Sequence, residues 1–318
     1  MSGETAQAIV TTSDSSQAGR SIIGAAGLPL DEDLYNLDDV ESSFFKQQTG
    51  IQDDAELKAH LLAVQKEAYA IHPYSCIRRF SWAKLKISRL FPYPELLKLG
   101  KERDGAIFLD IGCCFGNDAR KAIADGYPAQ NVVASDLHQA FWDLGHKLFK
   151  TTPETDPLTF IAGDVFDPSN LETIPAFTLA SPPTTATPQL STLRSLNPLR
   201  GHVSAIHASA FFHLFQEDDQ RRLAFALASL LSPEPGSMIF GQHASRPEKG
   251  QGDVTKARTS MFNHSPESWA ELWDGDVFEK GTVRVETQLV QLSGEEVLKT
   301  WKSPSHAVYV LNYSVTRL

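Results

Sequence analysis

A buried strand that breaks into a glycine turn and a helix is the feature that most constrains this chain. Residues 105–121 read GAIFLDIGCCFGNDARK: an apolar run reaches an acid, Asp110, and then a turn that carries Gly112 and Gly116. Glycine lets the backbone approach a ligand closely, and the helix predicted over 117–124 directs its first amide groups toward that ligand. The stretch therefore predicts a nucleotide-type pocket at the carboxyl end of a strand.

Strands and helices alternate after this stretch. Alternating units of this kind specify a parallel sheet covered by helices on both faces, and a helix with an apolar leucine stripe is predicted over 217–231. The last two segments alternate apolar and polar residues with no helix between them, which predicts an antiparallel pair that closes the sheet. The predicted strands are 106–111, 131–135, 158–162, 202–207 and 236–241, followed by 282–292 and 306–318.

The first hundred residues have a different pattern. A helix is predicted over 34–48, and a second begins at Asp53, followed by apolar residues at helical intervals, and ends before Pro73. The segment 175–200 is rich in Pro, Ser and Thr and is expected to be a long connection. We divide the chain into a disordered segment, 1–30, a helical N-terminal cap expected to act as a lid, 31–104, and an α/β domain, 105–318.

Charge and composition exclude several classes of function. The net charge of −10 disfavours binding to nucleic acid, because such binding depends on clustered Lys and Arg. No apolar run is long enough for a membrane span, and residues 1–20 lack the apolar core of a secretory signal. Three cysteines give no disulfide framework or zinc spacing, so we expect no metal and a cytosolic location. The expected partner is a small-molecule substrate, and a homodimer is left open.

Three acids lie at the carboxyl ends of predicted strands: Asp110, Asp136 and Asp164. In an open parallel sheet, ligands bind outside these strand ends. Asp136 follows the glycine turn at about the distance expected for an acid that binds ribose hydroxyls. Asp164 is placed to reach an exocyclic amine of a purine, and Asp110 to take a cationic amine. A ligand with an adenine, a ribose and a charged amino-acid tail fits all three acids.

These motifs resemble those of the class I S-adenosylmethionine-dependent methyltransferases. More narrowly, the chain resembles fungal small-molecule O-methyltransferases of secondary metabolism, including enzymes that methylate carboxylic acids in meroterpenoid pathways. The resemblance covers roughly 40–318 and implies a Rossmann-like sheet of seven strands, the last antiparallel, with S-adenosyl-L-methionine as cofactor and S-adenosyl-L-homocysteine as product. The motifs that carry it are SCIRRF (75–80), FLDIGCCFGND (108–118), ASDL (134–137), GDVF (163–166), HVSAIHASAFFHLF (202–215) and HSPESW (264–269).

The resemblance also implies roles for single residues. Asp110 and Gly112 are expected at the methionine part of the cofactor, and Asp136 at the ribose. Asp164 and Val165 are expected at the adenine. One departure is Cys114, which occupies a position where the superfamily often has a second glycine, so the turn either stands further from the methionine end or turns this side chain away. The remaining residues of the expected cofactor site are Cys113, Gly116, Leu137 and His207.

The methyl acceptor is expected beside the segment 206–215, which follows the fourth strand. His207 and His213 are candidate bases, although a hydrogen-bonded structural histidine is an equally good interpretation of either. Other residues are also expected to contact the substrate: Phe211 and Phe212 as apolar walls, Arg78 or Arg79 as a partner for a carboxylate, and His264 and Trp269 from the late insertion. The alternative for the aromatic residues is packing in the core. The alternative for the arginines is a solvated helix face.

We therefore predict an O-methyltransferase that acts on an apolar carboxylic acid or acidic enol. One alternative is an alcohol or phenol O-methyltransferase that uses a histidine base, and another is a non-catalytic regulator that binds the cofactor. Amino methylation of nucleic acid or protein is disfavoured because the SPP motif, 181–183, is followed by Thr184 instead of an aromatic residue. A dinucleotide-dependent reductase is disfavoured by the C-terminal antiparallel pair.

Overall fold

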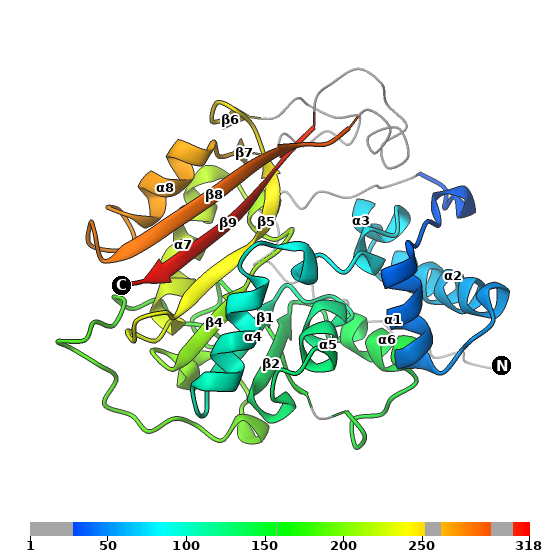
Figure 1. The fold of residues 1–318 in the computed structure, drawn as a ribbon, viewed down its shortest axis with the longest axis horizontal. Helices are drawn as coiled ribbons and strands as arrows, with labels where there is room; N and C mark the ends of the chain where they lie inside the picture. Colours follow the sequence, from blue (N-terminus) through cyan, green and yellow to red (C-terminus); the bar gives the residue numbers. More distant parts are fainter. Residues whose placement is uncertain (1–27, 157, 252–261, 294–307) are drawn as a thin grey trace, which may run out of the picture.

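The computed structural model describes residues 28–156, 158–251, 262–293 and 308–318, which are built around one seven-stranded sheet (Figure 1). The strand order is β3-β2-β1-β4-β5-β9-β8, and β9 is antiparallel to both neighbours, which confirms the expected sheet. Of the segment predicted to be disordered, 1–30, residues 1–27 lie outside the described residues. The strands are β1 (Ile107–Ile111), β2 (Val132–Asp136), β3 (Thr159–Ala162), β4 (Val203–His207), β5 (Met238–Ser245), β8 (Val283–Gln291) and β9 (Tyr309–Arg317).

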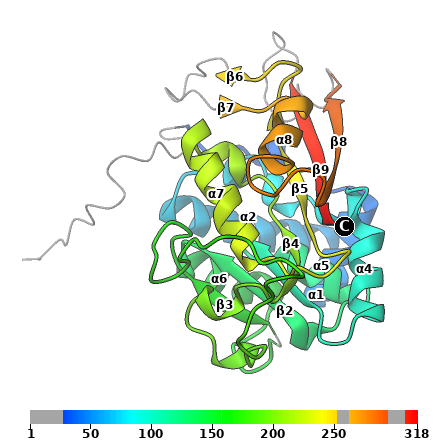
Figure 2. The ribbon, with the colours of Figure 1, turned by 90° about the vertical axis from the view of Figure 1, so that its left-hand side faces the viewer.

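The central strands are buried on both faces, which accounts for their nearly continuous apolar sequences. Every residue of β1 and of β4 is buried. The five parallel strands lie close to their predicted positions, but β5 continues past its predicted end at residue 241 because it pairs with β9 as far as Ser245. A second, two-stranded sheet of β6 (Gly250–Gln251) and β7 (Phe262–Asn263), which was not predicted, lies beyond β5 (Figure 2).

Helices cover both faces of the sheet, as the alternating pattern predicts. On one face, Phe108 and Phe240 pack against α4 and α5; on the other, Ile206 and Ile239 pack against α7 and α8. In the described residues, no helix is both long enough and apolar enough to cross a membrane. These helices are α4 (Tyr93–Glu102), α5 (Asn117–Ala124), α6 (Gln139–Phe149), α7 (Glu217–Leu230) and α8 (Pro266–Trp273), with short 3-10 helices η3 (Ile87–Arg89), η4 (Ala129–Asn131), η5 (Leu190–Thr192), η6 (Asn197–Leu199) and η7 (Phe212–Leu214).

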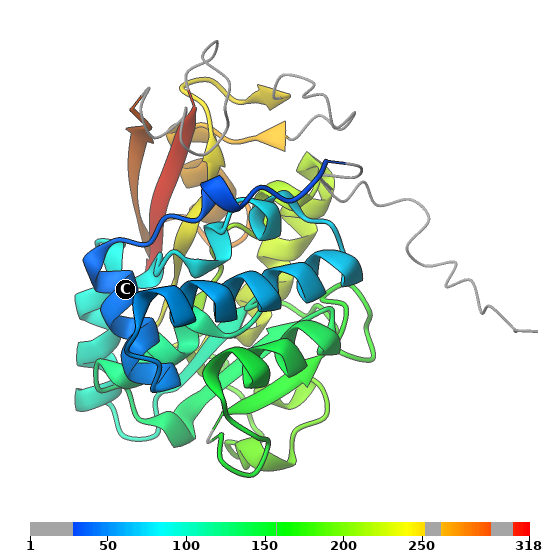
Figure 3. The same ribbon diagram turned by 90° about the vertical axis from the view of Figure 1, so that its right-hand side faces the viewer.

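The N-terminal helices pack against α6, whose outer side they cover (Figure 3). The prediction of one helix over 34–48 was wrong at its start, because Asp38 and Glu41 form a capping box and the helix begins at Asp39. The second helix begins after the predicted cap, Asp53. The elements of this region are η1 (Glu32–Leu34), α1 (Asp39–Thr49), α2 (Asp54–Ile71), α3 (Ser75–Arg78) and η2 (Ser81–Ala83).

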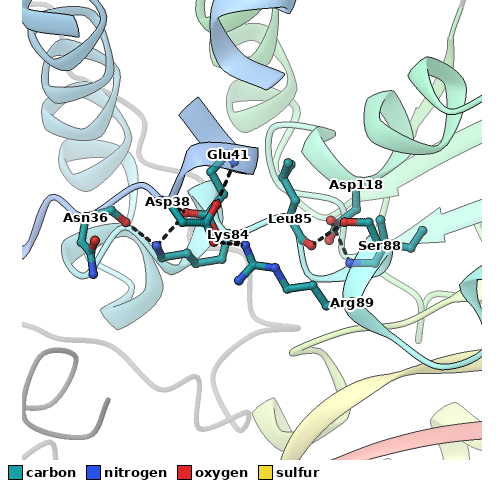
Figure 4. A network of polar contacts seen from close by, with 9 residues as sticks. Asn36, Asp38, Glu41, Lys84, Leu85, Ser88, Arg89 and Asp118 are labelled. Carbon is teal, nitrogen blue, oxygen red and sulfur yellow. Dashed lines mark hydrogen bonds and ion pairs between the residues drawn. The ribbon is translucent and has the colours of Figure 1, made fainter. Parts of the chain in front are cut away.

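A buried carboxylate ties α1 to the segment that leads into the sheet (Figure 4). The side chain of Glu41 is fully buried, and its Oε2 accepts hydrogen bonds from Lys84 Nζ at 2.8 Å and from the Asp38 amide at 3.0 Å. Its Oε1 accepts one from Arg89 Nη2 at 2.7 Å. The backbone of this segment is also held to α5, since the Ile87 amide donates to Asp118 Oδ1 at 3.2 Å.

Removal of the Glu41 carboxylate should loosen this connection. We expect Glu41→Ala to lower the free energy of unfolding by about 2–4 kcal/mol, because it leaves Lys84 without its anion, leaves Arg89 with Asp38 alone and removes the capping box. Urea unfolding followed by circular dichroism measures the change. Glu67→Ala is the matched control, because its pair with Lys147 is about half exposed on both sides and should contribute less than about 1 kcal/mol. Equal losses in both variants would contradict the assigned role.

Candidate active site

The sheet register brings Asp110 and His207 side by side at the carboxyl edge. Asp110 of β1 is the register partner of His207 of β4, and both side chains are buried. His207 Nδ1 lies 2.8 Å from Asp110 Oδ1, and its Nε2 lies 2.7 Å from Ser209 Oγ. The second carboxylate oxygen of Asp110, Oδ2, is buried and has no hydrogen-bond partner. A buried acceptor without a donor is costly, so this oxygen marks a place for a ligand that donates.

The glycine turn has the backbone conformation that its sequence predicts. Gly112 and Gly116 have φ values of +70° and +75°, which favour glycine. A Cβ on Gly112 would come within 2.8 Å of the Phe211 ring, so the acceptor segment lies directly against the turn. Arg120 holds the turn through its backbone, because its Nη1 donates to the Phe115 carbonyl at 2.8 Å. The central carbon of its guanidinium, Cζ, lies over the Trp142 ring, 4.7 Å from the ring centre.

Cys114 turns its side chain away from the cofactor side of the turn. It adopts a left-handed conformation with φ of +53°, as a glycine would, and its half-buried side chain packs against the apolar cluster of the N-terminal helices. Cys113 is buried between Ala134 and Trp142. Burial raises the pKa of both thiols well above its usual value, so they behave as small apolar packing residues. No group of three metal-ligating side chains occurs among the described residues.

Backbone amides hold the carboxylate of Asp136 in place. Its Oδ2 accepts from the Cys114 amide at 2.8 Å and its Oδ1 from the His138 amide at 3.0 Å. Burial raises the pKa of Asp136, and these two hydrogen bonds act in the opposite direction. Leu137, next in the chain, is 36% exposed, so part of its apolar side chain is accessible beside the acid.

Asp164 completes the row of acids two residues after β3. Its Oδ1 accepts from the Phe166 amide at 2.9 Å, an arrangement that fixes the turn after the strand. Val165 is buried against the core on the α7 side of the sheet. The structure thus places the three predicted acids along one edge, on strands that are neighbours in the order β3-β2-β1.

The segment after β4 lies between the glycine turn and the aromatic core. Ala210 has a φ of +53°, a strained value for a residue with a Cβ. Phe211 is half-buried and faces the turn, whereas Phe212 is fully buried, with its ring centre 4.9 Å from that of Trp269. Of the two predicted apolar walls, Phe211 is therefore the one that faces the site, and Phe212 supports it from the core.

Three histidines lie in or near this segment: His213 belongs to it, and His243 and His264 contact Trp269. Burial lowers the pKa of His213 to about 4, with Lys86 adding to the effect, and its Nδ1 has no partner. Burial lowers the pKa of His264 to about 4 as well, and its Nδ1 lies 3.0 Å from Ser268 Oγ. His243 of β5, which the sequence reasoning missed, is 3% exposed with both ring nitrogens unpartnered, and its ring centre is 4.3 Å from that of Trp269. It lies past the predicted end of the fifth strand at residue 241, so no sequence pattern indicated this contact.

The two arginines predicted to bind a carboxylate lie within the N-terminal region. Arg78 Nε donates to the Pro29 carbonyl at 2.8 Å, and Nη2 lies 4.0 Å from Asp31. Burial lowers the pKa of Arg79 to about 10, with Arg78 contributing. These contacts hold Arg78 to the start of the described chain. Ser209 was missed as a partner of His207, although its spacing of two residues along an extended segment was a usable signal.

The family model and two curated relatives that this chain matches are all described as methyltransferases. Residues 30–83 match the family model described as a meroterpenoid methyltransferase N-terminal domain. The chain is 33% identical over 222 residues to the O-methyltransferase phiE of a fungal species, covering 69% of this chain and 65%, just under two thirds, of that protein. It is also 33% identical over 218 residues to the asnovolin E/chermesin D methyltransferase nvfJ of Aspergillus novofumigatus, covering 69% of each.

Solved structures with a similar arrangement are distant in sequence. An S-adenosylmethionine-dependent methyltransferase from Mesorhizobium loti superposes with a TM-score of 0.41 at 13% identity, covering 73% of this chain and 100% of the other. The plantazolicin methyltransferase BpumL, solved in complex with S-adenosylhomocysteine, gives a TM-score of 0.44 at 12% identity, covering 88% of this chain and 96% of the other.

The uncharged state of His243 gives a pH dependence that can be measured. Burial lowers the pKa of His243 well below its usual value, so the unfolded chain takes up a proton below about pH 6.5 that the folded chain does not. Stability is therefore expected to fall as the pH falls. His243→Gln should reduce this slope by about 1.4 kcal/mol per pH unit between about pH 6.5 and pH 5 in urea titrations. An unchanged slope would contradict a buried neutral ring.

Proposed function

The chain belongs to the class I S-adenosylmethionine-dependent methyltransferases, within the group of fungal secondary-metabolite enzymes, and we propose that it methylates an oxygen atom of a small-molecule acceptor. S-adenosylmethionine is the cofactor of this family. Among the possible acceptors, a carboxylic acid or an acidic enol has the best support from the residues around the site.

The unpartnered Oδ2 of Asp110 carries the proposal. It is a buried acceptor beside a glycine turn, and the ammonium of the cofactor's amino-acid end is the donor that it lacks. In this proposal Asp110 and Gly112 hold the methionine part and Asp136 the ribose, while Leu137 offers its exposed surface to the base. The remaining contacts to the base fall to Asp164 and Val165. When bound, the cofactor supplies an electrophilic methyl group on a sulfonium.

His207 has a positioning role in this proposal instead of a role as base. Both of its ring nitrogens are engaged, one by Asp110 and one by Ser209, and the ring is 1% exposed. A base must have a ring nitrogen within hydrogen-bond reach of the acceptor's proton. Both ring nitrogens of His207 are already occupied by other partners. The ring instead fixes the Asp110 carboxylate so that its free oxygen points toward the ligand.

The state of His213 supports an acceptor that is already acidic. With a pKa of about 4, this ring is neutral at pH 7 and a weak base, poorly matched to an alcohol or an unactivated phenol. A carboxylic acid or acidic enol is anionic near neutral pH and needs no base. The relatives are consistent with oxygen as the methylated atom, since phiE is named an O-methyltransferase.

Alignment and exclusion of water are then the main tasks of the protein. Methyl transfer is an in-line displacement, and holding the attacking oxygen near the methyl carbon contributes several kcal/mol to the rate enhancement. Phe211 lies against Gly112 and excludes water from the turn, while Phe212 and Trp269 hold it from the core side. A non-catalytic regulator would keep the cofactor contacts but would not need the apolar wall at Phe211.

Loss of the Asp136 carboxylate tests the cofactor site. Asp136→Ala should weaken binding of S-adenosylhomocysteine in calorimetric titration by at least about tenfold, because it removes an anchored acceptor for the ribose hydroxyls. Asp143→Ala on α6 is the control, because this carboxylate contacts Gln139 at the surface and should not affect binding. Comparable affinity in wild type and Asp136→Ala would contradict the assignment.

Labelled cofactor tests the acceptor class. When the enzyme is incubated with methyl-labelled S-adenosylmethionine and an extract of fungal metabolites, the label should enter a compound that releases it on mild alkaline hydrolysis, as a methyl ester does. His213→Asn should retain this activity within about tenfold. A loss of a hundredfold or more, with binding of S-adenosylhomocysteine intact, would instead support an alcohol or phenol acceptor with His213 as base. Label found only in protein or RNA would refute a small-molecule acceptor.

A further inference from the structure

The segment 84–89 carries three cations, and two of them are neutralised within the N-terminal region. Lys84 and Arg89 both pair with the buried Glu41, as Figure 4 shows. Lys86 lies between them and is half-buried. Among the residues that the structure describes, its ammonium makes no ion pair or hydrogen bond. A half-buried cation without an anion is a candidate for binding one.

The backbone around Lys86 is fixed on both sides. Leu85 and Ile87 are fully buried, in the N-terminal cluster and in the cluster beneath α4 respectively. The Ile87 amide donates to Asp118 Oδ1 at the start of α5, which is the helix that follows the glycine turn. The backbone of Lys86 is therefore fixed beside the start of α5 by the packing of its two neighbours and by the hydrogen bond of Ile87.

Lys86 precedes the residue whose amide is hydrogen-bonded to Asp118 on α5, and its charge acts on groups on both sides of the glycine turn. Burial raises the pKa of Asp118, and the charge of Asp110 raises it further. The charges of His207 and Lys86 lower it. Asp118 is thus close to both Asp110 and Lys86. Lys86 also lowers the pKa of His213 in the acceptor segment, after the larger effect of burial. The charge of Lys86 therefore acts both on the start of α5, which follows the glycine turn, and on the acceptor segment.

The amino-acid end of the cofactor carries an ammonium and a carboxylate on the same carbon. A site for it needs an acceptor and a cation close to each other. Asp110 Oδ2 is a buried acceptor without a donor, and Lys86 is a cation without an anion. Asp118 does not neutralise Lys86 within ion-pair distance, and its Oδ1 is occupied by the Ile87 amide. The two unsatisfied groups are complementary to the two charges of an α-amino acid.

We propose that Lys86 binds the α-carboxylate of the cofactor's amino-acid end, opposite the Asp110 oxygen that accepts from its ammonium. The inference rests on the proposed function, since it assigns a contact to the same cofactor. It also gives the N-terminal region a direct part in cofactor binding, because the Glu41 network positions the segment that presents Lys86.

Calorimetric titration with two ligands tests the contact. S-adenosylhomocysteine carries the α-carboxylate, and its decarboxylated analogue keeps the amine but lacks the carboxylate. Lys86→Met should weaken binding of S-adenosylhomocysteine by about tenfold or more, as expected for loss of a charge-assisted hydrogen bond, and change binding of the analogue by less than about twofold. Lys86→Arg, which keeps the charge, should retain most of the affinity for S-adenosylhomocysteine.

Lys98→Met is the matched control, because Lys98 is exposed on α4 and its substitution changes the net charge equally. Thermal unfolding of each variant establishes that it is folded. Unchanged affinity of Lys86→Met for S-adenosylhomocysteine, or an equal loss for both ligands, would overturn the proposal; the first result would move Lys86 to the acceptor. Failure of the wild type to bind either ligand would instead refute the proposed function itself.

Discussion

The buried pair of Asp110 and His207 is the interaction on which the rest of the site depends. It joins two neighbouring strands at their carboxyl ends, one leading into the glycine turn and the other into the acceptor segment. Such a pair is expensive to bury unless its remaining atoms are satisfied. Ser209 satisfies the far nitrogen of the ring, which leaves one carboxylate oxygen as the unsatisfied atom. The cost of burial therefore falls on this one oxygen, the atom that we propose contacts the ligand.

The N-terminal region has a second function besides covering α6. Its buried Glu41 would be unstable alone, and the cations that neutralise it come from the segment that precedes α4. The same segment reaches α5 through the Ile87 amide and Asp118. One electrostatic network therefore fixes the cap and the first turn of the helix after the glycine loop. If the cap folded alone, this network would be incomplete. The stability of the cap therefore depends on the rest of the chain, although the sequence pattern changes at its boundary.

Most of the sheet could be predicted from the sequence because burial on both faces demands continuous apolar runs and the chain has few of them. The three acids were found for the same reason, since each ends such a run. Side-chain partners were harder. The resemblance marked Cys114 as standing at a glycine position, but the residue type did not show that its φ would be glycine-like or that its amide would donate a hydrogen bond to Asp136. His243 was missed because the predicted strand ended at residue 241, whereas β5 continues to Ser245.

Charge distribution is what separates a structural cation from a functional one in this chain. In the sequence, Lys84, Lys86 and Arg89 are three cations within six residues, with nothing to distinguish them. The fold distinguishes them, because Lys84 and Arg89 pair with the buried Glu41, whereas Lys86 has no ion pair among the described residues. An uncompensated cation beside a sulfonium would be repulsive. A carboxylate placed between the Lys86 ammonium and the sulfonium would attract both cations. For this reason we consider the position of Lys86 suited to an anion.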